Sequence, residues 1–390
     1  MSNNSLSVNF AGLELRNPLI VTASDVTRNV WQLEEAEKCG ASAIILKAIS
    51  IDPKALKSKT RFHFDKDSVF GFAGSKRLNC DEAERLVKNA KKTVKIPIGV
   101  NIIYSRPDDL DHYLDIARRM QEAGADFIEM NFFPSTMRKP EGVDIPQLIY
   151  EGVKAVKQIA TVPIMTKLTP EGVDVAQAAL AMEKGGADAI HAIDAVSGSP
   201  EIDIYDKGKL MMKGTKNSVL WLSGEYLRPV AQAAVIKVAK TVKIPVLGTG
   251  GITNWRHAVE MIMFGATAIG LCTVLMIHGF DALREIENKM RKFMEDTGFN
   301  RLEDFRGMAL KTILSYSTDI ELLPVTAKVN RDLCNGCGQC VKPAHCGVEH
   351  RAMRIVNGKA EVETEQCLGC GSCSYLCPTK AISMVFQGSR

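Results

Sequence analysis

Short, continuously apolar runs recur through roughly the first 270 residues of the chain. Four of them begin with Gly-Ala: GASAIIL from Gly40, GADFIEM from Gly124, GADAIHA from Gly186 and GATAIGL from Gly265. Three more are entered through a proline, and one precedes them all: IPIGV from Ile96, VPIMT from Val162, IPVLG from Ile244 and NPLIVTAS from Asn17. Proline at the first position of a strand costs no hydrogen bond in the sheet, and glycine suits the C-terminal cap of a preceding helix. The pattern predicts eight strands.

Between these runs the apolar residues recur with the period of a helix. Ala83, Leu86, Val87 and Ala90 lie at positions i, i+3, i+4 and i+7, and the segments from Leu110 and Trp255 repeat this spacing. Asn79 and Glu82 have the spacing of a capping box. Buried strands that alternate with amphipathic helices indicate a parallel sheet with right-handed crossovers.

Eight strand–helix units in roughly 255 residues match the usual size of a (β/α)8 TIM barrel, about 250 residues. An open doubly wound sheet is the alternative, but no Gly-x-Gly-x-x-Gly turn follows the first strand. We expect a barrel over residues 1–297, a helical connector over 298–328 and a small domain over 329–390.

The seventh unit, IPVLGTGGI at 244–252, delivers two adjacent glycines to the start of a helix expected over 254–264. Glycine lets backbone N–H groups approach an anion, and the helix dipole favours negative charge there. A tight turn would use the same residues. In a barrel, however, the loops after strands seven and eight are a common phosphate site, which favours phosphate binding by Thr249, Gly250, Gly251, Cys272 and Thr273.

Polar residues close other strands: Lys47, Asn131 and Lys167 end the second, fourth and fifth, and Asp194 follows the sixth. One lysine at a strand end is usually a solvated charge, but polar groups that converge in a concavity define a site. The loops at 132–144 and 197–223 are long and are therefore candidate lids.

Composition limits the possible partners. The chain has 390 residues, 46% of them hydrophobic and 24% charged, and a formal net charge of +4. Lys and Arg are dispersed, so we expect no nucleic-acid binding. The start, MSNNSLSVNF, lacks the features of a signal peptide, and no apolar run approaches the roughly eighteen residues of a membrane span. We expect a cytoplasmic protein without membrane association.

Eight of the eleven cysteines fall between Cys334 and Cys377. Each half of this tail has three cysteines at i, i+3 and i+6 followed by a fourth, which is the ligand pattern of two 4Fe-4S clusters in which the fourth cysteine ligates the other cluster. The expected sets are Cys334, Cys337, Cys340 and Cys377, and Cys367, Cys370, Cys373 and Cys346. Structural zinc is the alternative, although zinc modules usually use separated CxxC pairs. The wide gap before Cys346, and Gly347 where proline is usual, depart from the pattern.

Iron–sulfur clusters pass single electrons, so the barrel should hold a cofactor that exchanges one electron or two. Flavin mononucleotide (FMN) does so, and its phosphate would fill the site after strands seven and eight. A lysine near N1 and O2 of the ring stabilises the reduced anion, which is a role for Lys167.

The motifs FAGLELRNPLIVTAS, ILKAIS, EMN, MTKLTP, DAVSG, GTGGI and LCT, with the cysteine tail, resemble the dihydroorotate dehydrogenase family, most closely the flavin and ferredoxin part of dihydropyrimidine dehydrogenases. The resemblance implies an oligomer that receives electrons from an NAD(P)H-oxidising flavoprotein subunit or a ferredoxin. It also implies these FMN contacts: Ala23, Lys47, Ala48, Lys167, Gly224, Thr249, Gly250, Gly251, Cys272 and Thr273.

The substrate loop departs from the family. Where the family has Asn-Leu-Ser-Cys-Pro, this chain has Asn-Phe-Phe-Pro-Ser from Asn131, so Pro134 replaces the cysteine that exchanges a proton. Ser135 or Thr136 is the candidate substitute, through a hydroxyl that needs a relay partner. Two family asparagines appear as Ser105 and Asp194, and Asn131 is retained; these three are the expected substrate contacts.

We therefore expect reduction of a C=C bond beside a carbonyl, or its reverse, on a substrate that need not be a pyrimidine. An ionised aspartate only accepts hydrogen bonds, so Asp194 would suit a donor-rich or cationic substrate, and the two phenylalanines an aromatic or conjugated one. The alternatives are a subunit that has lost catalysis and only docks a partner, and a phosphosugar-handling barrel with a zinc tail.

Overall fold

A computed structural model of the chain describes residues 5–57, 59–71, 76–104, 109–132, 144–210, 220–313, 323–346 and 351–386. Contacts divide the chain into two compact units, Met1–Ile313 and Leu314–Arg390. The division falls inside the connector that we predicted over 298–328. Each unit is described by itself.

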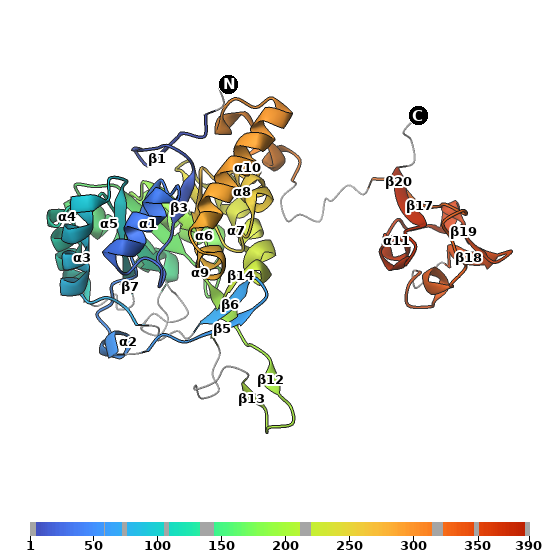
Figure 1. The fold of residues 1–390 in the computed structure, drawn as a ribbon, viewed down its shortest axis with the longest axis horizontal. Coiled ribbons are helices and arrows are strands. Elements are labelled where there is room, and N and C mark those ends of the chain that lie inside the picture. Colours follow the sequence, from blue (N-terminus) through green and yellow to red (C-terminus); the bar gives the residue numbers. More distant parts are fainter. Residues whose placement is uncertain are drawn as a thin grey trace. The chain divides into compact units, whose positions relative to one another are not determined.

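Eight parallel strands form a closed barrel in the first unit (Figure 1). In order around the barrel they are β3 (Leu19–Val21), β4 (Ala43–Ile45), β7 (Ile98–Tyr104), β8 (Phe127–Phe132), β9 (Ile164–Leu168), β10 (Ala189–Ala192), β15 (Val246–Thr249) and β16 (Ala268–Leu271), and β16 pairs with β3. Each begins within one of the eight predicted runs, and four of them, β7, β8, β9 and β15, continue past the end of the run. The predicted (β/α)8 barrel is confirmed.

Helices cover the barrel on the outside (Figure 1). They are α1 (Val30–Lys38), α3 (Cys80–Thr93), α4 (Leu110–Glu122), α5 (Ile145–Ile159), α6 (Val175–Gly185), α7 (Arg228–Thr241), α8 (Trp255–Met263) and α10 (Asp281–Thr297), with short helices α2 (Pro53–Lys57) and α9 (Thr273–His278). The capping box at α3 is confirmed, because Asn79 Oδ1 accepts from the Glu82 N–H at 2.8 Å and the Asn79 N–H donates to Glu82 Oε2 at 3.0 Å. Helix α3 buries the predicted face from Ala83 to Ala90.

The barrel unit continues past the end of α10. Leu302 and Phe305 are buried in the barrel's hydrophobic core, and the Phe305 ring lies 5.6 Å from that of Phe293 on α10. The Gly307 N–H donates to the Ile262 carbonyl at 2.9 Å. These contacts place residues 298–313 on the barrel, since the aromatic side chains of this segment complete its core rather than link two domains.

A four-stranded antiparallel sheet is built from the loops that follow β4 and β10. Its strands, in spatial order, are β11 (Val196–Gly198), β14 (Leu220–Gly224), β6 (Ser68–Gly71) and β5 (Phe62–Asp65). The candidate lid at 197–223 contributes β11 and β14, and between them the hairpin of β12 (Ile202–Asp203) and β13 (Lys209–Leu210) projects from the barrel (Figure 1). Most of the other candidate lid, 132–144, lies outside the described residues.

The described residues of the second unit form two antiparallel strand pairs, β17 (Val325–Val329) with β20 (Ile382–Phe386) and β18 (Met353–Val356) with β19 (Lys359–Val362), and the α-helix α11 (Ser372–Leu376). Among its described residues, one hydrophobic cluster contains eight buried residues, three of which are Cys334, Cys340 and Cys373. So small an apolar core calls for additional cross-linking, such as a bound metal centre.

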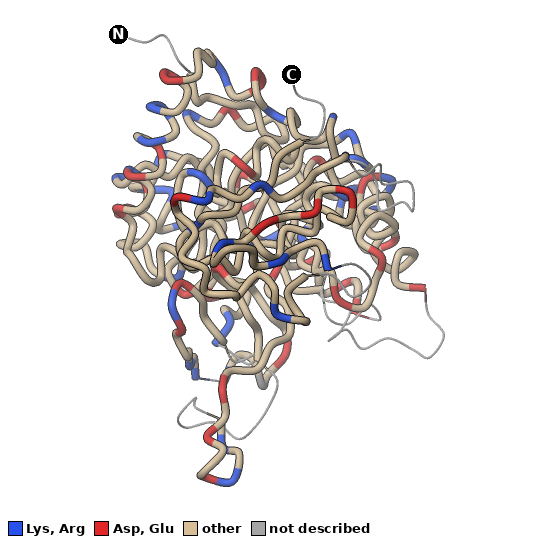
Figure 2. Tube along the Cα trace, turned by 90° about the vertical axis from the view of Figure 1, so that its right-hand side faces the viewer, with Lys and Arg blue, Asp and Glu red and all other residues tan. Residues whose placement is uncertain are grey.

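The distribution of charge agrees with the sequence expectation. Lys and Arg residues are interspersed with Asp and Glu along the trace (Figure 2). No helix in the described part of the chain is both long and apolar enough to cross a bilayer.

Candidate flavin, substrate and iron–sulfur sites

A cavity of about 330 Å³ is lined by residues that end or follow the barrel strands. This volume falls in the range of small-molecule sites, about 300–1,000 Å³. The structure brings all ten predicted FMN contacts to its wall: Ala23, Lys47, Ala48, Lys167, Gly224, Thr249, Gly250, Gly251, Cys272 and Thr273. Asn131 and Asp194 also line it. Ser105, Ser135 and Thr136 lie outside the described residues.

Lys167 and Asp194 form a buried ion pair on this wall. Lys167 Nζ lies 3.3 Å from Asp194 Oδ1, with side-chain exposures of 6% and 19%. Burial alone would lower the pKa of Lys167, but the carboxylates of Asp194 and Glu129 raise it above its ordinary value. Burial opposes ionisation of Asp194, yet the Lys167 ammonium and the Asn131 amide lower its pKa. Both groups are therefore charged at neutral pH.

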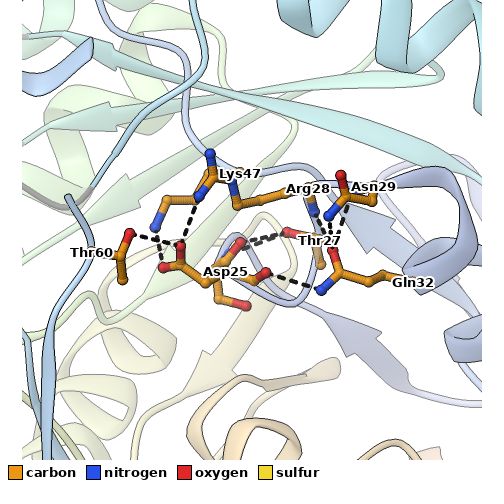
Figure 3. Close-up of polar contacts among 8 residues, drawn as sticks. Asp25, Thr27, Arg28, Asn29, Gln32, Lys47 and Thr60 are labelled. Atoms are coloured by element: carbon orange, nitrogen blue, oxygen red, sulfur yellow. Dashed lines mark hydrogen bonds and ion pairs between the residues drawn. The ribbon is translucent and has the colours of Figure 1, made fainter. Parts of the chain in front are cut away.

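Lys47 and Asp25 form a second ion pair, in which Lys47 Nζ lies 2.7 Å from Asp25 Oδ2. Figure 3 shows that Asp25 also accepts from Thr60 Oγ1, at 3.1 Å, and pairs with Arg28, at 3.2 Å. Burial lowers the pKa of Lys47, and the nearby cation Arg77 lowers it further. Our sequence reasoning missed Asp25, although its position just after the first strand could have indicated it.

Two asparagines on the wall have fixed amide orientations. Asn131 Nδ2 donates to Asp194 Oδ2 at 2.8 Å, and Asn101 Nδ2 donates to Glu129 in the barrel interior. Within the described residues, Oδ1 of each asparagine is buried without a hydrogen-bond partner. Because buried acceptors are normally satisfied, these two oxygens call for N–H or O–H groups from a ligand.

Glu129 is held in turn by His191. The two side chains are fully buried, with His191 Nδ1 at 2.5 Å from Glu129 Oε2. Burial lowers the pKa of His191, so we assign a neutral ring whose Nδ1–H donates to the carboxylate. His191 thus positions Glu129, and Glu129 positions Asn101.

The glycines after β15 leave the backbone exposed to the cavity. Gly250 and Gly251 have φ angles of +117° and +73°, which glycine adopts readily. A Cβ atom on Gly251 would lie 2.6 Å from Arg228 Cα, so a larger residue would displace the loop. Thr249 Oγ1 is buried without a partner in the described chain. The residues fit FMN: bare amides and an orphan hydroxyl for a phosphate, and the orphan acceptor of Asn101 for a ring N–H group.

In the small unit, the two predicted ligand sets are also spatial sets. Cys334, Cys337, Cys340 and Cys377 line one small cavity, and Cys346, Cys367, Cys370 and Cys373 line another. No three His, Cys, Asp or Glu side chains among the described residues are placed to hold a single metal ion. A cubane has a different requirement, because each thiolate binds its own iron atom.

Backbone amides point at several of these sulfur atoms. The N–H groups of Ala327, Met353, Ala360 and Ala381 donate to Cys367, Cys346, Cys334 and Cys377, at 3.2–3.4 Å. Hydrogen bonds to ligand sulfur stabilise the thiolate and adjust the potential of a cluster. Gly336 and Gly369 permit the tight ligand loops, since a Cβ atom on each would meet a backbone oxygen at 2.2 and 2.4 Å.

Comparisons with known proteins identify both units. Residues 5–294 match the family model for dihydroorotate dehydrogenase, and residues 326–378 match that for a 4Fe-4S dicluster domain. The NAD-dependent dihydropyrimidine dehydrogenase subunit PreA of Escherichia coli K12 is 28% identical over 400 residues, which cover 98% of this chain and 96% of that protein.

Two archaeal relatives cover the barrel. Each is the catalytic subunit of a dihydroorotate dehydrogenase B (NAD(+)). The Pyrococcus horikoshii protein is 32% identical over 319 residues, which cover 80% of this chain and 100% of that protein. The Thermoplasma acidophilum protein is 30% identical over 309 residues, covering 78% and 99%.

The buried pair Lys167–Asp194 gives a stability prediction. Lys167→Met leaves Asp194 buried without its cation, so we expect a loss of roughly 3–5 kcal/mol in the free energy of unfolding at pH 7. Adding Asp194→Asn should restore about 1–3 kcal/mol. Because the pKa of Asp194 is lowered in the folded protein, its ionised carboxylate stabilises the fold at neutral pH, and this stabilisation is lost as the pH falls below about 4. The difference in the free energy of unfolding between wild type and Lys167→Met should therefore shrink at low pH.

The effect is measured by denaturant unfolding of the wild type, Lys167→Met, Asp194→Asn and the double variant, which together form a double-mutant cycle. Lys157→Met is the control, because Lys157 pairs with Asp188 at 2.6 Å with a third or more of each side chain exposed. It should cost less than about 1 kcal/mol. Equal costs for the two lysine variants would contradict a buried pair.

Proposed function

Because the chain belongs to the dihydroorotate dehydrogenase family, whose members are flavin-dependent oxidoreductases, we propose that it reduces a C=C bond beside a carbonyl group, or catalyses the reverse reaction, with FMN and two 4Fe-4S clusters. NAD(P)H is the ultimate donor, and its electrons pass through the clusters to FMN. The substrate need not be a pyrimidine. The observation that carries the proposal is that Lys167, the orphan asparagine oxygens and the glycine cradle line one cavity.

FMN, when bound, supplies hydride exchange with the substrate and single-electron exchange with the clusters. The chain's own residues hold and orient it. The amides of Gly250 and Gly251, with Thr249 and Thr273, would hold the phosphate. Lys167 would lie beside the N1 and O2 edge, where its positive charge favours the anionic reduced ring. Cys272 remains a neutral thiol, because burial raises its pKa.

Each cluster is assigned four cysteines. Cys334, Cys337, Cys340 and Cys377 would hold one, and Cys367, Cys370, Cys373 and Cys346 the other. The two separate cavities, each lined by four of these residues, support this division. This arrangement does not support the zinc alternative, because no three His, Cys, Asp or Glu side chains among the described residues are placed to hold a single metal ion.

Ser135 and Thr136 are the candidates for proton exchange with the substrate, because Pro134 has no proton to give. Ser105, Asn131 and Asp194 are the proposed substrate contacts. Because Nδ2 of Asn131 is engaged by Asp194, the atom that its amide leaves for a substrate is the acceptor Oδ1, which suits a substrate N–H or O–H group.

The proposed function requires a protein that delivers electrons to the clusters. The relative in Escherichia coli is named as a subunit, which supports a partner protein for this chain. We propose that an NAD(P)H-oxidising flavoprotein subunit or a ferredoxin delivers the electrons, in an oligomer located in the cytoplasm.

Loss of the cradle should release the flavin. In Gly251→Ala the new methyl group meets the backbone of Arg228, and the displaced loop can no longer surround the phosphate. We expect at least about tenfold weaker FMN binding, equivalent to about 1.4 kcal/mol, with the far-ultraviolet circular dichroism unchanged. Gly279→Ala is the matched control, because its φ is also positive, at +75°, but nothing lies within 4 Å of the added Cβ.

Catalysis is tested on the anaerobically purified holoenzyme. After reduction by dithionite, mixing with a panel of unsaturated carbonyl compounds that includes uracil and thymine should reoxidise the flavin with at least one compound. Ser135→Ala or Thr136→Val should slow that step by about 10²–10⁴-fold if the hydroxyl exchanges the proton. Flavin that stays reduced across the whole panel would point instead to a docking subunit without catalysis.

A further inference from the structure

Two carboxylates act on the lysine that we place beside the flavin. Lys167 Nζ lies 3.3 Å from Asp194 Oδ1, and the carboxylate of Glu129 raises the pKa of Lys167 together with that of Asp194. Lys167 and Glu129 are buried, and the Asp194 side chain is only 19% exposed. One positive charge therefore has two negative charges as neighbours, and this part of the wall does not present a ligand with the charge of an isolated lysine.

The carboxylate of Asp194 is held by groups other than the lysine. Its Oδ2 atom accepts from Asn131 Nδ2 at 2.8 Å, and its Oδ1 atom accepts from the Ala195 N–H at 2.8 Å. The Asp194 N–H donates to the Leu168 carbonyl at 2.8 Å, which ties the residue to the end of β9. Because both oxygens are engaged, Asp194 is less available to a cationic substrate than its sequence position suggested. Its charge is fixed beside Lys167.

Reduction changes the charge of a flavin at the edge where we place the lysine. Two electrons and one proton convert the neutral oxidised ring to its anionic reduced form, so one negative charge is added near N1 and O2. A lysine alone stabilises this charge and therefore raises the reduction potential. A carboxylate 3.3 Å from that lysine acts in the opposite sense, because charges in a site shielded from water act strongly on one another and on a neighbouring anion.

We propose that Asp194 lowers the reduction potential of bound FMN by cancelling most of the charge of Lys167. This inference rests on the proposed function and gives Asp194 a role beyond substrate contact. A lower potential favours transfer of a hydride, which is two electrons and one proton, from the flavin to the C=C bond; a second proton completes the saturated product. It disfavours the uptake of electrons from the clusters by the same factor. Asp194 thus favours the half-reaction in which the substrate is reduced.

A purely structural role for Asp194 is the alternative, because a buried lysine needs a carboxylate to stay protonated. The two roles predict different signs. If the charge of Asp194 reaches the ring, its removal raises the flavin potential. If Asp194 only keeps Lys167 protonated, its removal lowers the potential or leaves it unchanged, because the lysine then loses its proton. Glu129 remains beside Lys167 in either case, which favours a lysine that stays charged.

The test measures the midpoint potential of the flavin in the FMN-loaded full chain, by anaerobic titration against a reference dye. Flavin absorbance is the readout, and electron paramagnetic resonance follows the clusters separately. We expect Asp194→Asn to increase the ratio of reduced to oxidised flavin at a given potential about 10- to 100-fold, which corresponds to a midpoint about 30–60 mV more positive. Asp194→Ser, which is smaller and also uncharged, should shift the midpoint in the same direction.

A double variant tests the cancellation itself. Lys167→Met with Asp194→Asn removes one charge of each sign, so its reduced-to-oxidised ratio should stay within about threefold of wild type. Lys167→Met alone should give a ratio about 10- to 100-fold below that of the double variant, because the two proteins differ only in the carboxylate. This comparison isolates the charge of Asp194 without the lysine, and it applies even if the single Asp194 variants fail to fold.

Asp188→Asn is the matched control. Asp188 precedes β10 and Asp194 follows it, so the two residues lie at opposite ends of one strand, and Asp188 also pairs with a lysine, Lys157, at 2.6 Å. Because it lies away from the carboxyl ends of the strands, Asp188→Asn should leave the flavin potential unchanged.

A midpoint that is unchanged or more negative in the uncharged Asp194 variants overturns the inference but leaves the proposed function intact, since FMN is still bound and reduced. An equal shift in Asp188→Asn also overturns it, because the effect would then not depend on a charge beside Lys167. Equal midpoints for Lys167→Met and the double variant overturn it as well. A wild-type protein that binds no FMN overturns the proposed function itself.

Discussion

Parallel strands that close into a barrel must all end on one rim, and this constraint gathers residues that are far apart in the chain. Lys47, Asn131 and Lys167 lie on three different strands or just beyond them, and Thr249 and Cys272 on two more, yet all line one cavity. In barrels of this kind the active site lies at the carboxyl ends of the strands, where the loops that follow them and the helix starts with free amides meet. The closed barrel thus determines which side chains can meet in the site.

Burial at this rim then decides which charges can coexist. A lysine removed from water is stable as a cation only beside a carboxylate, and Asp194 and Asp25 supply one to each lysine. These pairs keep Lys167 protonated for the proposed flavin anion. The buried chain from His191 through Glu129 to Asn101 serves orientation instead, because it fixes which end of an amide the cavity presents.

Much of the fold and part of the site could be predicted from the sequence, since they depend on local patterns. Proline and Gly-Ala entries located all eight strands, and CxxCxxC spacing located the cysteine sets. Asp25 was missed because its role depends on contacts with Lys47 and Thr60, which lie 22 and 35 positions away and which no local pattern encodes. The barrel unit extends to Ile313, beyond the predicted boundary at residue 297. The sequence did not indicate this extension, because it depends on the packing of Phe305 against Phe293 of α10, which is a tertiary contact. Asp194 was identified, but its partners, and hence its reduced capacity to bind a cation, became visible only in three dimensions.

The most direct measurement is an anaerobic reductive titration of the purified protein, followed by absorbance for the flavin and by electron paramagnetic resonance for the clusters. If a barrel flavin exchanges electrons with two clusters, as we propose, the protein should take up about four electrons per chain, two at the flavin and one at each cluster. Electrons added through one centre should then equilibrate with the others. Uptake of about two electrons with no iron–sulfur signal, or cluster reduction that never reaches a flavin, would contradict a coupled flavin and iron–sulfur enzyme.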